Sequence, residues 1–256
     1  MAILLPWGLS KVLGNMQESR IVILVDYSNL GLYKHKPIDN TVIAILSKVM
    51  RYVEATYVHC LVRFYGGWFT EEGQSDEGKD VFKRLQGHES FIEKQVGKNG
   101  QIVGVNVRIE MAGSILQKPE KDLFFTYRKK ARTYDIQVKD KNDVACKHDS
   151  CLLPLLAKFL KTRRCPREGC LIDTDDLVWR SEQKLVDSMI VCDLLYCAGV
   201  QTDFIVLVSD DDDFVPPLLA LSVTNVKNNI VRLSPKGQVG TRRFGYKIPN
   251  LINECL

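Results

Sequence analysis

Short apolar runs that end in acidic residues dominate the hydrophobic pattern of this chain. Residues 20–26 (RIVILVD) and 204–208 (FIVLV) are too short for helices and rich in β-branched side chains, so each run predicts a buried strand. Asp26 ends the first run, and four aspartates at 210–213 follow the second after a single serine. Both predicted strands therefore end in carboxylates.

The remaining pattern predicts helices alternating with strands. A helical pattern follows Pro37, and residues 57–65 and 101–111 predict two more strands. Because strand-helix-strand order is typical of a parallel sheet, we expect an α/β fold with a Rossmann-like parallel sheet. The other predicted segments are a polar loop over 71–80, a short helix over 81–96 broken around Gly87, a helix over 182–197 capped by Ser181, a strand over 229–234 and a short helix over 248–256.

Two segments depart from this pattern. Residues 1–19 form an apolar arm that lacks the basic start and cleavage site of a secretory signal and is shorter than a membrane span. We expect the arm to dock on its own domain, on a second copy or on a protein partner. Residues 112–180 bring short apolar pieces, many basic residues and four cysteines. We interpret them as an insertion into a domain that spans 20–256.

Size and composition narrow the class of protein. A chain of 256 residues can bury one substantial core and carry one inserted module. It contains no apolar run long enough to span a membrane, and we expect a cytoplasmic protein without a membrane partner. The eight cysteines are then expected to be thiols or metal ligands rather than disulfides. The net charge of +4 is mild, so electrostatic arguments must rest on local clusters.

The four consecutive aspartates are expected in a strand-to-helix turn. Pro216 and Pro217 suit the first turn of the next helix, which puts the aspartates at the carboxyl end of a strand, where α/β sheets bind ligands. Two carboxylates about 4 Å apart repel by roughly 4 kcal/mol at an effective dielectric of 20, so their convergence requires a helix N-terminus or a divalent cation. The alternative is a solvated turn with one aspartate as N-cap.

Other polar residues extend the candidate site. Asp26 and Asn29 follow the first strand, although an Asx turn is an equally good interpretation of that pair. Lys184 and Asp187 are three residues apart and share a face of the predicted helix over 182–197. Asp193 lies six residues beyond Asp187 and is turned away, so we expect only one of the two aspartates to point into a site.

Basic clusters in the insertion suggest a nucleic-acid surface. Aromatic residues alternate with cations over 121–132, and a second basic cluster follows near residue 163. Cations neutralise phosphates and aromatic faces stack on unpaired bases, so a single-stranded nucleic acid is the expected partner. The alternative is an amphipathic strand with a solvated basic face. The candidate binding residues are Arg128, Lys129, Lys130, Arg132, Arg163 and Arg164.

Two cysteine pairs lie between and beside these clusters. Cys146 and Cys151 form one pair, and Cys165 and Cys170 form the other thirteen residues later. Four thiolates at such separation suit a tetrahedral structural Zn²⁺, which would staple an insertion without its own core. His148 can replace one cysteine as a ligand. The alternative is four ordinary reduced thiols.

Three stretches together resemble the NYN domain of the LabA-like group, in the PIN-like nuclease superfamily. They are residues 23–29 (ILVDYSN), 184–193 (KLVDSMIVCD) and 206–216 (VLVSDDDDFVP), and they occur in the family's order. The resemblance implies a Rossmann-like, PIN-like sheet and a metal-dependent endonuclease that generally acts on RNA. It carries the acidic positions over to Asp26, Asp187, Asp211 and Asp213, with Asn29 beside them. Nothing about the cysteine-bearing insertion is implied.

The expected function is hydrolysis of phosphodiester bonds, with RNA as substrate. Asp26, Asp187, Asp211 and Asp213 are expected to hold Mg²⁺ or Mn²⁺, the hard cations that prefer oxygen ligands. Lys184 is expected to meet a backbone phosphate, and Asp193 to hold Lys184 or a loop. Asp210, where the family commonly has a small residue, either adds charge to the metal site or faces water. The alternatives are a non-cleaving RNA-binding or scaffold module and a nuclease for single-stranded or flapped DNA.

Overall fold

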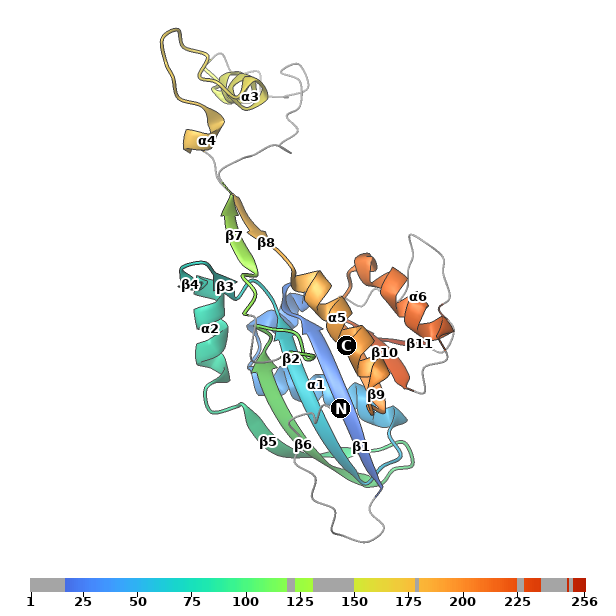
Figure 1. Ribbon diagram of the computed structural model, residues 1–256. Helices are drawn as coiled ribbons and strands as arrows, with labels where there is room; N and C mark the ends of the chain where they lie inside the picture. The colour runs from blue at the N-terminus through green and yellow to red at the C-terminus, as the bar shows by residue number, and fades with distance from the viewer. Residues whose placement is uncertain are drawn as a thin grey trace.

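A seven-stranded, mostly parallel β-sheet forms the centre of the molecule (Figure 1). The computed structural model describes residues 17–118, 123–130, 150–177, 180–224, 228–235, 248 and 251–256. The sheet order is β11-β10-β9-β1-β2-β6-β5, and all neighbouring strands pair in parallel except the edge strand β5. The α/β class with a parallel sheet is therefore confirmed. Residues 1–16 of the predicted arm lie outside the described residues.

The strands match the apolar runs of the sequence closely at the centre of the sheet. Their bounds are β1 Glu18–Asp26, β2 Tyr57–Tyr65, β5 Ser90–Val96, β6 Ile102–Met111, β9 Phe204–Val208, β10 Asn229–Ser234 and β11 Leu251–Cys255. Along β1, Ile23 and Val25 pack into one apolar cluster and Leu24 into another. Both faces of the strand are thus buried, which explains why its sequence is a continuous apolar run.

Helices cover both faces of the sheet (Figure 1). On one face lie α1 (Ile38–Val49) and α2 (Asp76–Leu85), and on the other lie α5 (Val186–Gly199) and α6 (Val215–Val223). Among the described residues, no helix combines the length and the apolar character needed to cross a bilayer. The short elements are η1 Tyr27–Asn29, η2 Gly31–His35, η3 Met50–Tyr52, β3 Phe69–Thr70, β4 Gly73–Gln74 and η5 Asp212–Phe214.

A two-stranded antiparallel ribbon carries part of the predicted insertion away from the sheet (Figure 1). Its strands are β7 (Tyr127–Lys130) and β8 (Arg180–Gln183). Beyond the ribbon lie α3 (Leu153–Thr162) and α4 (Thr174–Leu177). We call residues 150–177 the distal unit. The ribbon separates it from the buried core of the domain.

The predicted loop over 71–80 and helix over 81–96 are only partly correct, because the helix spans Asp76–Leu85 and residues 90–96 form a strand. Helix α2 begins at Asp76, because Ser75 caps it by accepting a hydrogen bond from the Gly78 amide at 3.0 Å. The predicted loop was inferred from polarity, but those polar residues form the outer face of this helix. Gly87, with φ +82°, follows the helix, and residues 90–96 then pair with β6 as an edge strand. Such pairing across the chain is invisible to local periodicity.

The predicted helix over 182–197 begins too early. Residues 180–183 pair with β7 instead, so Ser181 lies in a strand and does not cap a helix. Leu185 then adopts a left-handed conformation, with φ +66°, and α5 starts at Val186. Lys184 therefore lies before the helix and does not share a helical face with Asp187.

The predicted terminal helix over 248–256 is also wrong. Residues 251–255 form β11, which pairs in parallel with β10 at the sheet edge. The Tyr52 hydroxyl donates a hydrogen bond to the Glu254 carboxylate and ties this strand to the body. The segment is too short for stable helix nucleation, and the free edge of β10 offers it backbone partners instead.

Candidate functional site at the carboxyl edge of the sheet

Asp26 is the buried anchor of this edge. It is the last residue of β1, its side chain is only 1% exposed, and it accepts hydrogen bonds from three side chains. The donors are the Ser28 hydroxyl at 2.7 Å, the Asn29 amide at 2.5 Å and the Ser209 hydroxyl at 3.0 Å. These donors fix the orientation of the carboxylate. The structure thus brings Asp26 and Asn29 together, as the sequence predicts.

The acidic loop after β9 is linked to Asp26 through Ser209. Val25 of β1 lies opposite Val208 of β9, so Asp26 and Ser209 end neighbouring strands at the same level. The Asp211 amide donates to the Ser209 hydroxyl at 3.0 Å, and that hydroxyl donates to Asp26. Asp211 also caps η5, because its carboxylate accepts from the Asp213 amide at 2.9 Å. Asp211 therefore serves as an N-cap, as one interpretation of the sequence predicts, and also lies near the other acids, as the other interpretation predicts.

Two residues of β10 support the loop from behind. The Arg232 guanidinium donates to the carbonyl oxygens of Ser209 at 3.2 Å and of Asp211 at 3.0 Å. Its Nη2 also lies 3.8 Å from the Asp212 carboxylate. Ser234 donates its hydroxyl to Asp210, so this acid is held against β10. A buried cation beneath four aspartates offsets part of their repulsion.

Asp187 completes the group from the first turn of α5. Its side chain is exposed at the rim of the edge. Partial desolvation raises the pKa of this carboxyl, and the charges of Asp26, Asp211 and Asp213 raise it further. Acids from β1, from α5 and from the loop after β9 therefore come within electrostatic range of one another. That arrangement opposes folding unless something positive offsets it.

Asp193 anchors α5 rather than entering the site. Its carboxylate is fully buried, pairs with Arg63 of β2, and accepts hydrogen bonds from the Tyr65 hydroxyl and, at 2.7 Å, the Leu116 amide. Burial raises the pKa of Asp193, against the opposing effect of the Arg63 charge. The expectation that Asp193 holds a loop fits the bond to Leu116. The predicted contact between Asp193 and Lys184 is wrong, because the Lys184 ammonium group pairs with the Glu182 carboxylate at 2.7 Å.

Sequence reasoning missed four supporting residues, although a signal existed for two of them. Arg63 and Arg232 each interrupt a buried apolar strand, and a charge in such a place requires a buried partner. Ser209 and Ser234 gave no comparable signal, because serines at strand ends are common. The hydrogen bonds of all four became visible only once the strands were paired.

The predicted nucleic-acid residues lie on the ribbon and the distal unit. Arg128, Lys129 and Lys130 belong to β7, and their side chains lie outside the description, as does Arg132 entirely. Arg163 ends α3 in a left-handed conformation, with φ +61°, and the backbone of Arg164 forms an antiparallel β-bridge with that of Asp173. The basic residues of the distal unit are thus separated from the acidic edge by the ribbon (Figure 1).

The cysteines of the insertion are only partly described. Cys146 and His148 lie outside the description, while Cys151 precedes α3, and Cys165 and Cys170 lie in the loop after it. The pKa of the Cys165 thiol is lowered, first by a hydrogen bond from the Arg167 amide and then by one with Cys170. Of the other cysteines, Cys60 and Cys197 are buried in the core, Cys255 is half-buried and Cys192 is exposed.

The acidic edge suits a hard cation by its chemistry. Where the structure describes the chain, no three His, Cys, Asp or Glu side chains form a ready coordination group. Mg²⁺ does not need one, because it keeps several waters and binds through one or two carboxylates. The candidate ligand atoms are all oxygens. The pKa of Asp187 is raised first by partial desolvation and then by the charges of Asp26, Asp211 and Asp213, and a cation would offset that second contribution. The residues therefore fit Mg²⁺ or Mn²⁺ better than zinc.

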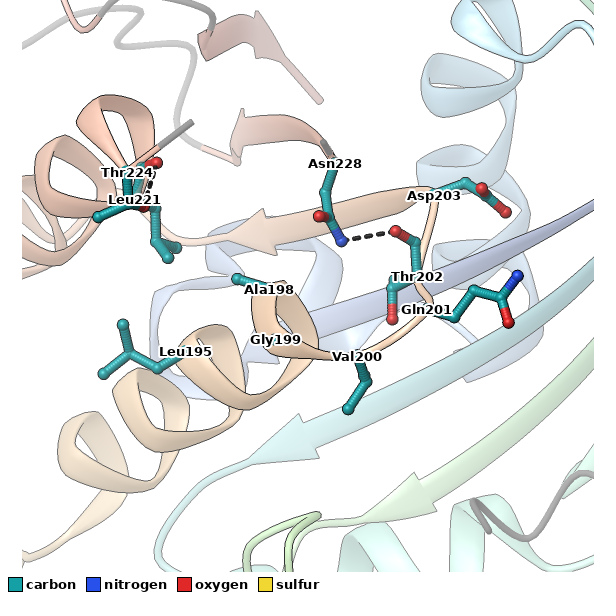
Figure 2. Close-up of a pocket in the computed structure, with 10 residues that line it drawn as sticks. All are labelled: Leu195, Ala198, Gly199, Val200, Gln201, Thr202, Asp203, Leu221, Thr224 and Asn228. Atoms are coloured by element: carbon teal, nitrogen blue, oxygen red, sulfur yellow. Dashed lines mark hydrogen bonds between the residues drawn. The ribbon is translucent and has the colours of Figure 1, made fainter. Parts of the chain in front are cut away.

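A cavity of about 710 Å³ lies at the opposite end of the strands (Figure 2). It is lined by the last residues of α5, by the segment leading into β9 and by residues near the end of α6. The Asn228 side chain donates to the Thr202 carbonyl at 2.5 Å on its wall. None of the predicted site residues lines this cavity.

Comparisons with protein-family models, with curated proteins and with solved structures found no match to this chain.

Proposed function

We propose that this chain is a metal-dependent endonuclease of the PIN-like kind that hydrolyses phosphodiester bonds in RNA. The observation that supports the proposal is the approach of Asp26, Asp211 and Asp213 to Asp187, whose pKa is raised first by partial burial and then by these three charges. A fold has no structural need to gather acids from three elements at one rim. A cation that bridges them to a polyanion supplies the reason.

Each acid has a distinct part in this proposal. Of Asp26, Asp187, Asp211 and Asp213, one or two carboxylates would bind Mg²⁺ or Mn²⁺ directly and the others would hold its water ligands. The cation would lower the pKa of a bound water and offset charge on the phosphate oxygens. Asp26 provides a fixed carboxylate because three side chains hydrogen-bond to it. Asn29 keeps that carboxylate oriented, and Arg232 fixes the backbone of the acidic loop.

The test is cleavage of labelled RNA by the full chain, with Mn²⁺ and with a chelator. We expect cleavage that needs the cation, and we expect Asp26→Asn and Asp211→Asn to abolish it. Asp76→Asn is a matched control, because Asp76 is a fully exposed acid on α2. Cleavage that survives in either site variant, or in the chelator, contradicts the assignment.

The same assay separates the competing functions. Binding of RNA without cleavage in Mn²⁺ would favour the scaffold module, and faster cleavage of single-stranded or flapped DNA of the same sequence would favour the DNA nuclease. The acids speak against a scaffold, since mutual repulsion at the rim has no use in a module that only binds. The proposal keeps the cytoplasmic setting and the RNA substrate expected from the sequence.

A further inference from the structure

The loop between α3 and α4 is a tight hairpin with a cysteine on each side of its tip. Arg164 and Asp173 form an antiparallel bridge, and the Cys165 amide donates to the Ile172 carbonyl at 2.9 Å. The Cys170 amide donates to the Arg167 carbonyl at 3.3 Å, and Gly169 turns the chain with φ +75°. This backbone brings the two cysteines face to face.

The two thiols share one polar environment. The sulfur of Cys165 accepts a hydrogen bond from the Arg167 amide and forms another with Cys170. Neither thiol is in a disulfide. An amide that points at one sulfur, with the second sulfur within hydrogen-bonding reach, stabilises negative charge at the tip of the hairpin. Two neighbouring cysteine sulfurs are half of the ligand set of a tetrahedral soft-metal site, to which both would bind as thiolates.

The distal unit has little apolar core to hold this hairpin in place. Phe159 and Thr174 are its only buried residues within the part that the structure describes. Its large apolar side chains are exposed instead, namely Leu152, Leu153, Leu155, Leu156, Leu171, Ile172 and Leu177. A unit of this size without a core needs a cross-link to keep one conformation.

We propose that Cys165 and Cys170 bind Zn²⁺ as half of a structural thiolate site that holds the distal unit together. Zinc is the expected ion because thiolates are soft ligands and a structural site needs no open position. Each thiol releases its proton to solvent as its sulfur–zinc bond forms. The site is separate from the acidic edge, whose oxygen ligands suit a different metal.

The remaining two ligand positions decide how the site closes. Among the described residues no third Cys, His, Asp or Glu joins the pair at metal-binding spacing. Cys151 of the same unit is one candidate, and a hairpin of a second copy is another. One zinc per chain in a monomer indicates closure within the chain, and one zinc per two chains in a dimer indicates closure between copies. Both results support zinc on Cys165 and Cys170.

The test is the zinc content of the full chain, purified under reducing conditions and measured by elemental mass spectrometry. We expect bound zinc in the native protein and at least about a tenfold loss in the variant Cys165→Ser/Cys170→Ser, since each lost ligand weakens the site steeply. Cys192→Ser is the matched control, because this thiol is exposed on α5. Asp211→Asn should keep its zinc, which distinguishes this site from the proposed hydrolytic one.

Two further readouts keep the proposal decisive if the serine variant folds poorly. Cobalt substitution of the native protein should give thiolate-to-cobalt charge-transfer absorption that zinc displaces. A zinc-selective chelator should speed proteolysis between residues 150 and 177 while the sheet domain stays intact. A native protein that takes up no zinc, a double variant that retains it, or a Cys165–Cys170 disulfide trapped by alkylation at lysis would each overturn the proposal.

Discussion

The two edges of the sheet use aspartate in opposite ways. At the amino edge, Asp203 accepts hydrogen bonds from the Ser19 hydroxyl at 3.0 Å and from the Arg20 amide at 2.7 Å, and so ties the start of β9 to β1. At the carboxyl edge, Asp26 also accepts several hydrogen bonds, but there partial burial and the charges of Asp26, Asp211 and Asp213 raise the pKa of Asp187. A single aspartate that accepts hydrogen bonds from uncharged donors connects two strands and has a structural role. Several aspartates at one edge add mutual repulsion, and this repulsion is the basis of the proposed cation site.

Helix α5 connects the two edges, and its anchor carries the largest expected effect. Asp193→Ala would remove one of the two carboxylates that pair with the buried Arg63, leaving Glu110 at 2.6 Å, and should lower the free energy of unfolding by about 3 kcal/mol. Chemical denaturation monitored by circular dichroism measures this change. A double change, Asp193→Leu with Arg63→Met, should recover much of the loss. Equal destabilisation by the single and double variants would show that the ion pair is not the anchor.

The next-largest expected effect is on the cleavage rate, and it distinguishes the two edges of the sheet. Asp26→Asn should lower the rate of metal-dependent RNA cleavage by about 100-fold or more, equivalent to roughly 2.7 kcal/mol of transition-state stabilisation. Asp203→Asn should leave the rate per folded molecule unchanged, because it lies at the opposite end of β9. The measurement is the single-turnover cleavage rate of both variants. Similar losses in the two variants would remove the distinction between the edges.

Asp203, unlike Asp26, is expected to matter for stability rather than for the cleavage rate. Asp203→Ala removes the acceptor for Ser19 and Arg20, which should cost about 1 kcal/mol of unfolding free energy. Thermal denaturation of this variant and the native chain, both without divalent cations, measures the difference. Ser19→Ala should cost less, since the Arg20 amide keeps its acceptor. No loss in Asp203→Ala would mean that β1 and β9 need no tie at this edge.

The smallest effect is a gain. Because the folded-state pKa of Asp187 is raised, folding becomes less favourable as pH rises through the range in which this carboxyl ionises. Asp187→Asn should therefore melt about 1–2 °C higher than the native chain at neutral pH without divalent cations, the effect being small because the side chain is exposed.

This advantage should vanish as pH falls below the ordinary range of carboxyl groups, where the native Asp187 is neutral. Added Mn²⁺ should then stabilise the native chain more than the variant. Differential scanning calorimetry across pH, with and without Mn²⁺, measures both effects. A variant that melts lower than the native chain at neutral pH would contradict the repulsion described here.

The centre of the sheet was predictable because its strands are buried on both faces. An apolar run such as that of β1 carries its own evidence, and parallel order then puts Asp26 and the acidic loop at one edge. The edges of the fold were not predictable in this way. Strand β5 and the start of α5 depend on pairing with β6 and β7, and no local period encodes a partner that lies elsewhere in the chain.

The residues of the candidate site also differ in how well the sequence predicts them. Asp26, Asp187, Asp211 and Asp213 were identified from strand ends and from family resemblance, and the structure brings them within electrostatic range. Lys184 was assigned to a helical face that does not exist, because β8 takes up the residues before it. Arg232 was missed although its charge stands inside an apolar strand. A charged residue inside an otherwise apolar strand is thus the most useful sequence signal for a buried ion pair.

Leu185 makes the ribbon and the helix that bears Asp187 mechanically continuous. It is one of two described non-glycine residues with positive φ, a conformation that costs about 1–2 kcal/mol. The strand β8 ends two residues before it, and Asp187 follows two residues after it. The backbone conformation of Leu185 therefore sets the angle between the ribbon that carries the distal unit and the helix that carries Asp187.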